Sequence, residues 1–294
     1  MSEPTDTRTA QAVLTEANHA HDERFHLLHR FDDGVQSGAW LVSDETGRQA
    51  VLKWSPDLSW APQIERAAAA VAKIRAAGYP TPAWLAVGTS ADGFGYQIQE
   101  LAPGHIAQEL TAREARLLID VLEMHAGLDP DPQRCWSEFA TTRMTGDDLW
   151  RRTAVAGPTG RDLVKACERL LAAHGPVTLP TGDLVHGDFR PGNILFHADR
   201  VGGVIDIEAL GSGTRVFDYA TLLSAHDITP EALEMLCDAG EQVAGPGVLA
   251  FCFVQVALDL TVFVHQRELQ LGIQNVGKLV ERTLILLNRA EGRG

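Results

Sequence analysis

The chain has 294 residues, 45% hydrophobic and 22% charged, an ordinary globular composition with enough length for two lobes or one large domain. Its formal net charge of −14 argues against a nucleic-acid partner, because a polyanion is bound by basic surface. No pair of its four cysteines has C-x-x-C spacing, which predicts free buried thiols and a reducing, cytoplasmic location.

The first hundred residues are predicted to form strands around one helix. Residues 62–77 are rich in alanine and end at Gly78, with Pro80 close behind, which predicts a helix with a well-marked end. Short apolar runs bounded by turn residues predict strands over 25–31, 38–43, 49–55, 83–88 and 94–101.

Beyond residue 104 the pattern predicts helices. Thr111 and Glu114 have capping-box spacing, in which a hydroxyl and a carboxylate satisfy free amides at the start of a helix. Residues 129–160 are polar with Pro and Gly, which indicates a mobile insert. Residues 160–173 predict another helix.

The most apolar segment covers residues 248–264 and contains Gln255 and Asp259. It falls short of the roughly 20 apolar residues of a membrane span, so it predicts a buried helix and no membrane partner. Taken together, the patterns predict a strand-rich lobe over residues 1–102 and a helical lobe over residues 103–294.

Three polar residues in the second lobe have the spacing that phosphoryl transfer requires. The reaction needs metal ions to neutralise phosphates and a carboxylate to accept a hydroxyl proton or orient the nucleophile. Asp188 and Asn193 share one loop, and a predicted hairpin over residues 194–205 then delivers Asp206. Because carboxylate and amide oxygens are hard ligands, Asn193 and Asp206 suit Mg²⁺.

The run from His186 to Asn193 (HGDFRPGN), followed by Ile205-Asp206-Ile207-Glu208, resembles the signature of the aminoglycoside phosphotransferase family. The resemblance implies a protein-kinase-like α+β fold with an antiparallel-sheet N-terminal lobe and a mainly helical C-terminal lobe. It implies Asp188 as the catalytic base, with Asn193 and Asp206 as magnesium ligands. His186 would stiffen the loop through hydrogen bonds, and Glu208 would support the metal side of the site.

The same resemblance assigns the first lobe to binding of ATP or GTP. Lys53 would hold the phosphates, and Glu65, in the helix that follows, would form an ion pair with it. Glu100 and Ala102 would offer backbone groups to the purine base. Ser37 would contact the phosphates from a loop that has two glycines where kinases have three.

Asp218 resembles the family aspartate that anchors the catalytic loop. Residues 216–266 hold seven acids and no Lys or Arg, which predicts either a solvated acidic face or a pocket for a cationic ligand. The resemblance favours the pocket, because in this family these helices form the wall of the acceptor site. The preferred contacts are Asp227, Glu231, Asp259 and Glu268.

The predicted function is Mg²⁺-dependent transfer of the γ-phosphate of ATP or GTP to a hydroxyl of a cationic small molecule. An aminoglycoside or a basic peptide antibiotic such as a tuberactinomycin is expected, and phosphorylation would confer resistance by adding charge and bulk. The alternatives are a metabolic kinase for homoserine, choline or a sugar, and a catalytically silent binding protein. Choline would need an aromatic cage, and the chain beyond Asp206 has no Trp and one Tyr.

Overall fold

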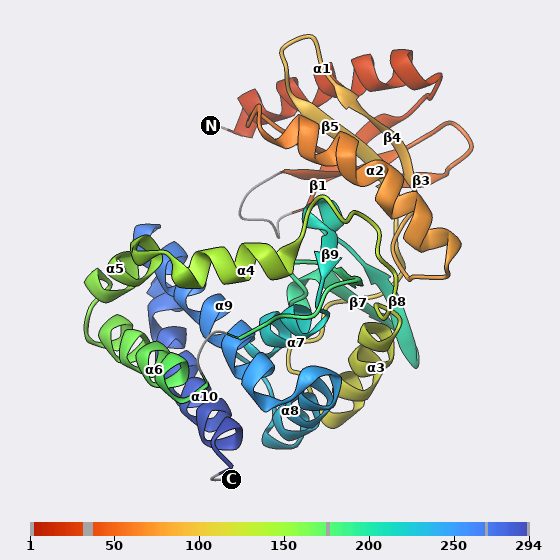
Figure 1. Cartoon of the computed structure of the whole chain (residues 1–294). Helices are drawn as coiled ribbons and strands as arrows, with labels where there is room; N and C mark the ends of the chain where they lie inside the picture. Colours follow the sequence, from red (N-terminus) through yellow and green to blue (C-terminus); the bar gives the residue numbers. More distant parts are fainter. Residues whose placement is uncertain (1–2, 32–37, 175–176, 268–269, 293–294) are drawn as a thin grey trace. The chain divides into compact units, whose positions relative to one another are not determined.

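A computed structural model describes residues 3–31, 38–174, 177–267 and 270–292 (Figure 1). The chain divides into two compact units, one formed by Met1–Gly104 with Gly202–Ala209, the other by His105–Val201 with Leu210–Gly294. The sequence-based prediction placed the lobe boundary after residue 102 and assigned Gly202–Ala209 to the helical lobe. This segment belongs to the first unit because the Val204 amide donates to the Pro80 carbonyl at 2.6 Å.

The first unit is built on an antiparallel five-stranded sheet with strand order β1-β2-β3-β5-β4. Its described elements before residue 104 are α1 (Glu3–His21), β1 (His26–Arg30), β2 (Ala39–Ser43), β3 (Gln49–Ser55), α2 (Trp60–Ala76), β4 (Trp84–Thr89) and β5 (Gly95–Glu100). The returning segment adds the short 3₁₀ helix η2 (Ile207–Ala209), which packs against α2.

Alternation along β3 determines which side chains face each helix. Leu52 and Trp54 belong to a buried core that includes Val13 and Leu14 of α1. Because successive side chains of a strand point to opposite faces, Lys53 lies on the other face of the sheet. That face carries α2, which packs against β4 and β5.

The second unit is mainly helical. Its elements are α3 (Ala112–Glu123), α4 (Trp136–Thr145), α5 (Asp147–Val155), α6 (Pro158–His174), β6 (Asp183–Val185), η1 (Pro191–Asn193), β7 (Ile194–His197), β9 (Gly211–Gly213), α7 (Val216–Leu223), α8 (Pro230–Ala244), α9 (Pro246–Gln266) and α10 (Gln270–Ala290). β8 (Arg200–Val204) spans the boundary between the units and forms the predicted hairpin with β7.

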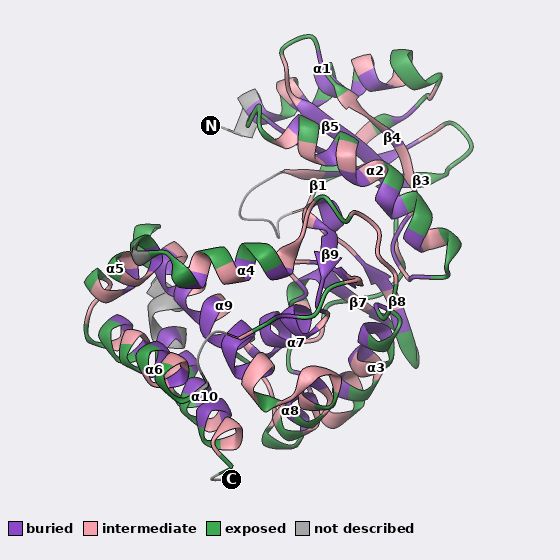
Figure 2. Cartoon of the chain, viewed as in Figure 1, coloured by how far each residue is buried: buried purple, intermediate pink, exposed green. Residues whose placement is uncertain are grey.

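Helix α9 is the central helix of the second unit. It packs against α5, α6, α7, α8 and α10, and Figure 2 shows the extent of its burial. By length and composition alone it could cross a membrane, and 67% of its most apolar window is buried inside the structure. A helix that is apolar on all sides suits such a central position, so the predicted buried helix is confirmed.

Two sequence-based expectations have different outcomes. The capping box of α3 is confirmed, since Thr111 accepts from the Arg113 amide and the Glu114 carboxylate accepts from the Thr111 amide. The predicted mobile insert over residues 129–160 is wrong, because this segment contains α4 and α5. Met144 of α4 and Leu149 of α5 are buried and fix the segment to the rest of the unit.

Candidate active site

The loop after β6 is held in place by a buried aspartate. Asp218 of α7 is fully buried, and its two carboxylate oxygens accept hydrogen bonds from the amides of His186 at 2.7 Å and Gly187 at 2.9 Å. The Nδ1 atom of His125 lies 3.2 Å from the same carboxylate. Charge-assisted bonds to two consecutive amides fix the backbone of the loop, which is the geometry that an anchoring aspartate requires.

Asp188 follows these anchored residues and leaves its carboxylate accessible. Its side chain is 46% exposed, and Oδ2 accepts from Asn193 Nδ2 at 3.1 Å and pairs with Arg190 Nε at 3.0 Å. The Asp188 amide donates to Nδ1 of His186 at 3.2 Å. Asp188 is therefore oriented by its neighbours and open to a ligand.

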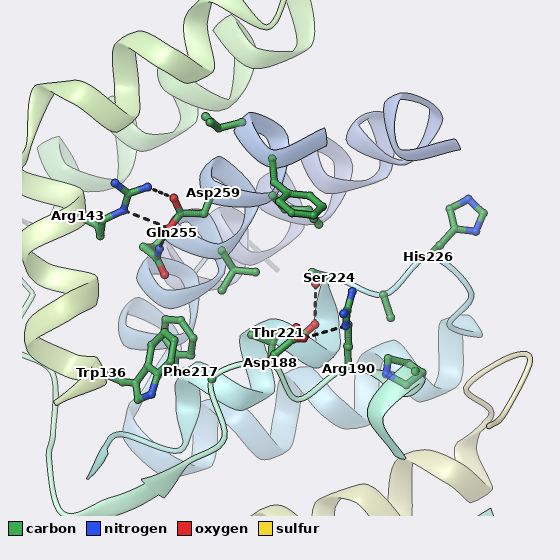
Figure 3. A pocket seen from close by; sticks show the side chains of 18 of the residues that line it. Trp136, Arg143, Asp188, Arg190, Phe217, Thr221, Ser224, His226, Gln255 and Asp259 are labelled. Atoms are coloured by element: carbon green, nitrogen blue, oxygen red, sulfur yellow. Dashed lines mark hydrogen bonds and ion pairs between the residues drawn. The ribbon is translucent and has the colours of Figure 1, made fainter. Parts of the chain in front are cut away.

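A cavity of about 720 Å³ lies beside Asp188 (Figure 3). Trp136 and Phe217 form one part of its wall, and Arg143 and Asp259 another. Among the described residues, those that line the cavity all belong to the second unit. They come from residues 106–108, α4, α5, the loop of Asp188, α7, residues 224–227 and α9. Trp136 and Arg143 had no signal in the sequence, because both lie in the segment that resembled a mobile insert.

The acids predicted to bind a cationic acceptor have unequal positions. Asp227 lines the cavity and pairs with His226 Nδ1 at 2.6 Å. Asp259 also lines it, but its carboxylate binds Arg143 and the Gln255 amide. Glu231 does not line the cavity, which corrects the prediction: it is an exposed residue in the first turn of α8, where the helix dipole favours a carboxylate.

The remaining acids of this stretch are used within the fold. Glu234, Asp238 and Glu241 of α8 all bind the guanidinium of Arg289 in α10. The hydrogen bonds that Arg289 donates to Glu241, Asp238 and Glu234 raise the pKa of Arg289 above its ordinary value. The stretch has no Lys or Arg of its own, yet an arginine from another helix binds three of its seven acids.

The first unit contains an ionic cluster around the buried Lys53, whose Nζ lies 2.5 Å from Oδ1 of Asp206 and 2.8 Å from Oε1 of Glu208. Gln97, paired with Lys53 across β3 and β5, donates from Nε2 to the same Glu208 oxygen at 2.8 Å. Burial would lower the pKa of Lys53, but the charges of Glu208 and Asp206 outweigh it and raise that pKa. The lysine is therefore a fixed cation.

The predicted ion pair between Lys53 and Glu65 is not the one formed. Glu65 accepts a hydrogen bond from Thr89 Oγ1 at 2.9 Å. Thr89 lies on β4, and β5 separates β4 from the strand of Lys53. Two strand spacings amount to roughly 10 Å, beyond the reach of an ion pair. Glu208 takes this place because the returning segment carries it into the first unit.

Asn193 and Asp206, the two predicted magnesium ligands, each carry an oxygen of the kind that Mg²⁺ binds. Asp206 has the positive backbone φ of 59° that aspartate tolerates better than most residues. Asn193 uses its Nδ2 atom on Asp188, which leaves the carbonyl Oδ1 as its possible ligand atom. Among the described residues no group of three His, Cys, Asp or Glu side chains could hold a metal. Mg²⁺ needs only one or two protein ligands, since it keeps waters and binds phosphates.

The remaining predicted contacts concern the nucleotide base and phosphates. The amide of Glu100 is used on the Ala83 carbonyl at 2.9 Å, and its carboxylate accepts from the Ala83 amide at 3.0 Å. The base would therefore have to use the Glu100 carbonyl and the backbone of Ala102, which follows the end of β5. Ser37 and Glu268 lie outside the described residues.

Comparison with known proteins identifies the family. A model of the phosphotransferase enzyme family matches residues 28–252 of the chain. The chain belongs to this family. The protein is thus a phosphotransferase, and Asp188, Asn193 and Asp206 all lie within the matched region.

One curated relative is a homoserine kinase from Granulibacter bethesdensis, 32% identical over 100 residues. That alignment covers 30% of this chain and 31% of the relative's own length. A thermostable mutant of the aminoglycoside phosphotransferase APH(4)-Ia, with ADP and hygromycin B, has a TM-score of 0.65 at 16% identity, covering 95% of this chain and 98% of that one.

The amicoumacin kinase hAmiN, in complex with AMP-PNP, Ca²⁺ and Ami, has a TM-score of 0.63 at 15% identity, covering 95% of this chain and 96% of that one. Together with the APH(4)-Ia match, this likeness confirms the expected α+β fold of the aminoglycoside phosphotransferases.

Proposed function

We propose that the protein transfers the γ-phosphoryl group of ATP or GTP to a hydroxyl of a small molecule bound beside Asp188. The observation that carries this proposal is the position of Asp188, on a loop anchored by Asp218 and open to a cavity of about 720 Å³. That volume is in the range of small-molecule sites.

Asp188 would act as the base. The acceptor oxygen attacks the γ-phosphorus, the bond to the bridging β–γ oxygen breaks, and the hydroxyl proton passes to Asp188. Arg190 and Asn193 both contact Oδ2 of this carboxylate. Their hydrogen bonds restrain the carboxylate in one orientation, so that little freedom is lost when the acceptor binds.

Lys53 would hold the nucleotide phosphates, and Asn193 and Asp206 would hold Mg²⁺. When bound, the metal would neutralise charge on the phosphates. The role of Lys53 is supported by its fixed positive charge, and a nucleotide by the ADP and AMP-PNP in the two similar structures. The Glu100 carbonyl would accept a hydrogen bond from the edge of a purine, and the Ala102 amide would donate one to it.

The acceptor is proposed to be an antibiotic, because the similar structures contain hygromycin B and Ami. Phosphorylation would then confer resistance by adding negative charge and bulk. A cationic antibiotic would find Asp227 in the cavity, but Asp259 is already bound by Arg143. A second candidate is homoserine phosphorylation, which the partial match to a homoserine kinase favours.

The test is phosphate transfer followed by mass spectrometry, with ATP or GTP, Mg²⁺, L-homoserine and a panel of antibiotics. Asp188→Asn should lower kcat by about 10²–10⁴-fold, the usual contribution of a positioned base. Asp162→Asn is the matched control, since Asp162 is an exposed α6 residue paired with Lys165 outside the cavity. Undiminished transfer by Asp188→Asn would refute the assignment of the base.

A further inference from the structure

The cavity beside Asp188 is balanced in charge, although the acid-rich stretch supplies part of its wall. Among the described residues that line it there are three arginines and three aspartates, whose formal charges cancel. They are Arg143, Arg152, Arg190, Asp188, Asp227 and Asp259. A polycationic acceptor would gain no net electrostatic attraction from such a wall.

The pair formed by Arg143 of α4 and Asp259 of α9 is the main reason for this balance. Both side chains are partly exposed, at 28% and 30%, and Gln255 donates to the same carboxylate. A cationic ligand would have to displace the guanidinium to reach Asp259. The intact pair instead presents donors and acceptors side by side, which suits a neutral polar group or a zwitterion.

Another part of the cavity wall is apolar and aromatic. The Trp136 ring lies 5.1 Å from the Phe139 ring and 4.9 Å from the Phe217 ring, measured between centroids. All three rings line the cavity, as does Phe263 of α9. Apolar surface of this kind binds an aromatic or bulky apolar group, at about 25 cal/mol per Å² removed from water.

We infer that the acceptor is an amphipathic hydroxyl compound with an aromatic or bulky apolar group and at most one net charge. Its apolar group packs on the wall formed by Trp136 and Phe217, its polar edge meets the pair formed by Arg143 and Asp259, and its hydroxyl reaches Asp188. This inference rests on the proposed function, which makes the cavity the acceptor site.

Binding measured without nucleotide separates this inference from the proposed chemistry. Calorimetry would compare chloramphenicol, an uncharged aromatic diol, and erythromycin, a macrolide with one amine, with the polycation kanamycin. We expect at least one of the first two to bind about 10-fold or more tightly than kanamycin, a difference that an apolar group can supply. Tighter binding of kanamycin, or no binding of either amphipathic compound, overturns the inference.

Arg143→Gln gives a sharper test, because it leaves Asp259 without its cation. Kanamycin affinity should rise about 5-fold or more, because the Asp259 carboxylate could then attract an ammonium group of kanamycin at this partly exposed site. Arg169→Gln removes a similar ion pair, with Glu291, outside the cavity and should leave kanamycin affinity unchanged. Equal kanamycin affinities for wild type and Arg143→Gln would contradict the masking of Asp259.

Trp136→Ala should weaken the amphipathic ligand about 10-fold, and Trp136→Phe should restore most of the loss. Equal binding of the amphipathic ligand by wild type and a folded Trp136→Ala protein would contradict a contact with the aromatic wall. If that variant does not fold, the comparison of Arg143→Gln with Arg169→Gln still decides the inference. Binding without phosphate transfer would count against the proposed function alone. Transfer to kanamycin in preference to both amphipathic compounds would support that function and refute this inference.

Discussion

Lys53 shows how two carboxylates can hold a buried lysine in its charged form. Its side chain is almost fully buried, an environment that disfavours an ammonium ion, yet two carboxylates and their hydrogen bonds keep it charged. Asp206 is also a proposed metal ligand. Glu208 is buried and fixed by Gln97, so it is the partner that would stay with Lys53 when Asp206 binds Mg²⁺.

We therefore expect Glu208→Gln to impair catalysis more than Glu65→Gln. Loss of the charged partner should reduce kcat/KM for the nucleotide about 10- to 100-fold, the equivalent of one buried hydrogen bond to a charged group. Steady-state kinetics with varied nucleotide would measure it, because loss of packing alone would not raise the nucleotide KM selectively.

The Glu65→Gln variant is the matched control, since its carboxylate binds Thr89 on another strand. Its nucleotide KM should stay within about two-fold of wild type, as surface substitutions usually cost little. A large change of the nucleotide KM in Glu65→Gln with none in Glu208→Gln would support the ion pair between Lys53 and Glu65 that the sequence predicted.

At the scale of elements, the catalytic loop depends on a close approach between Gly187 and α4. Gly187 has a φ of +86°, and a Cβ atom there would lie 2.1 Å from Cζ2 of Trp136. The loop can pass the indole only where a side chain is missing. Trp136 thus supports the loop of Asp188 as well as lining the cavity.

Gly187→Ala should destabilise the protein by roughly 2–6 kcal/mol, because unfavourable backbone conformation and overpacking each cost about 1–3 kcal/mol. Denaturant unfolding would measure the loss. Gly192→Ala is the control in the same loop, with nothing within 4 Å of the added carbon, and its stability should change by less than about 1 kcal/mol. Similar losses in both variants would show that the indole contact is not the cause.

At the scale of the whole molecule, local signals predicted structure better than they predicted partners. The capping box at Thr111 depends on residues close together in the chain, and the buried helix α9 depends on composition, so both could be predicted from the sequence. The partners of Lys53 and of the acid-rich stretch depend on contacts between distant segments. Glu208 is 155 residues from Lys53, and no periodic pattern records which carboxylate Arg289 will neutralise.

Folding should also protect the cysteines unequally. Cys167, Cys237 and Cys252 are buried, whereas Cys135 is partly exposed. Only an accessible thiolate reacts quickly, so a thiol reagent at neutral pH should titrate one cysteine in the native protein and all four after unfolding. Rapid reaction of a Cys135→Ser variant would show that a second thiol is accessible in the native state.

Those buried thiols also give the stability of the fold a defined dependence on alkaline pH. Burial raises the pKa of Cys237 and of Cys252 from 9.0 to about 12. Between these values the unfolded chain has lost protons that the folded chain retains, so the free energy of unfolding should fall as the pH rises. The full contribution is present below pH 9.0 and disappears as the pH approaches 12, at roughly 1 kcal/mol per pH unit for each thiol.

Urea unfolding at about pH 8 and about pH 10 would measure this slope. Cys252→Ala removes one titrating group from the core, so its stability should be lower at the lower pH but should decline less steeply between the two. Equal slopes for the variant and the wild type would mean that the Cys252 thiol ionises alike in both states. The Cys252 thiol, in the core around α9, would then lose its proton while the protein is still folded.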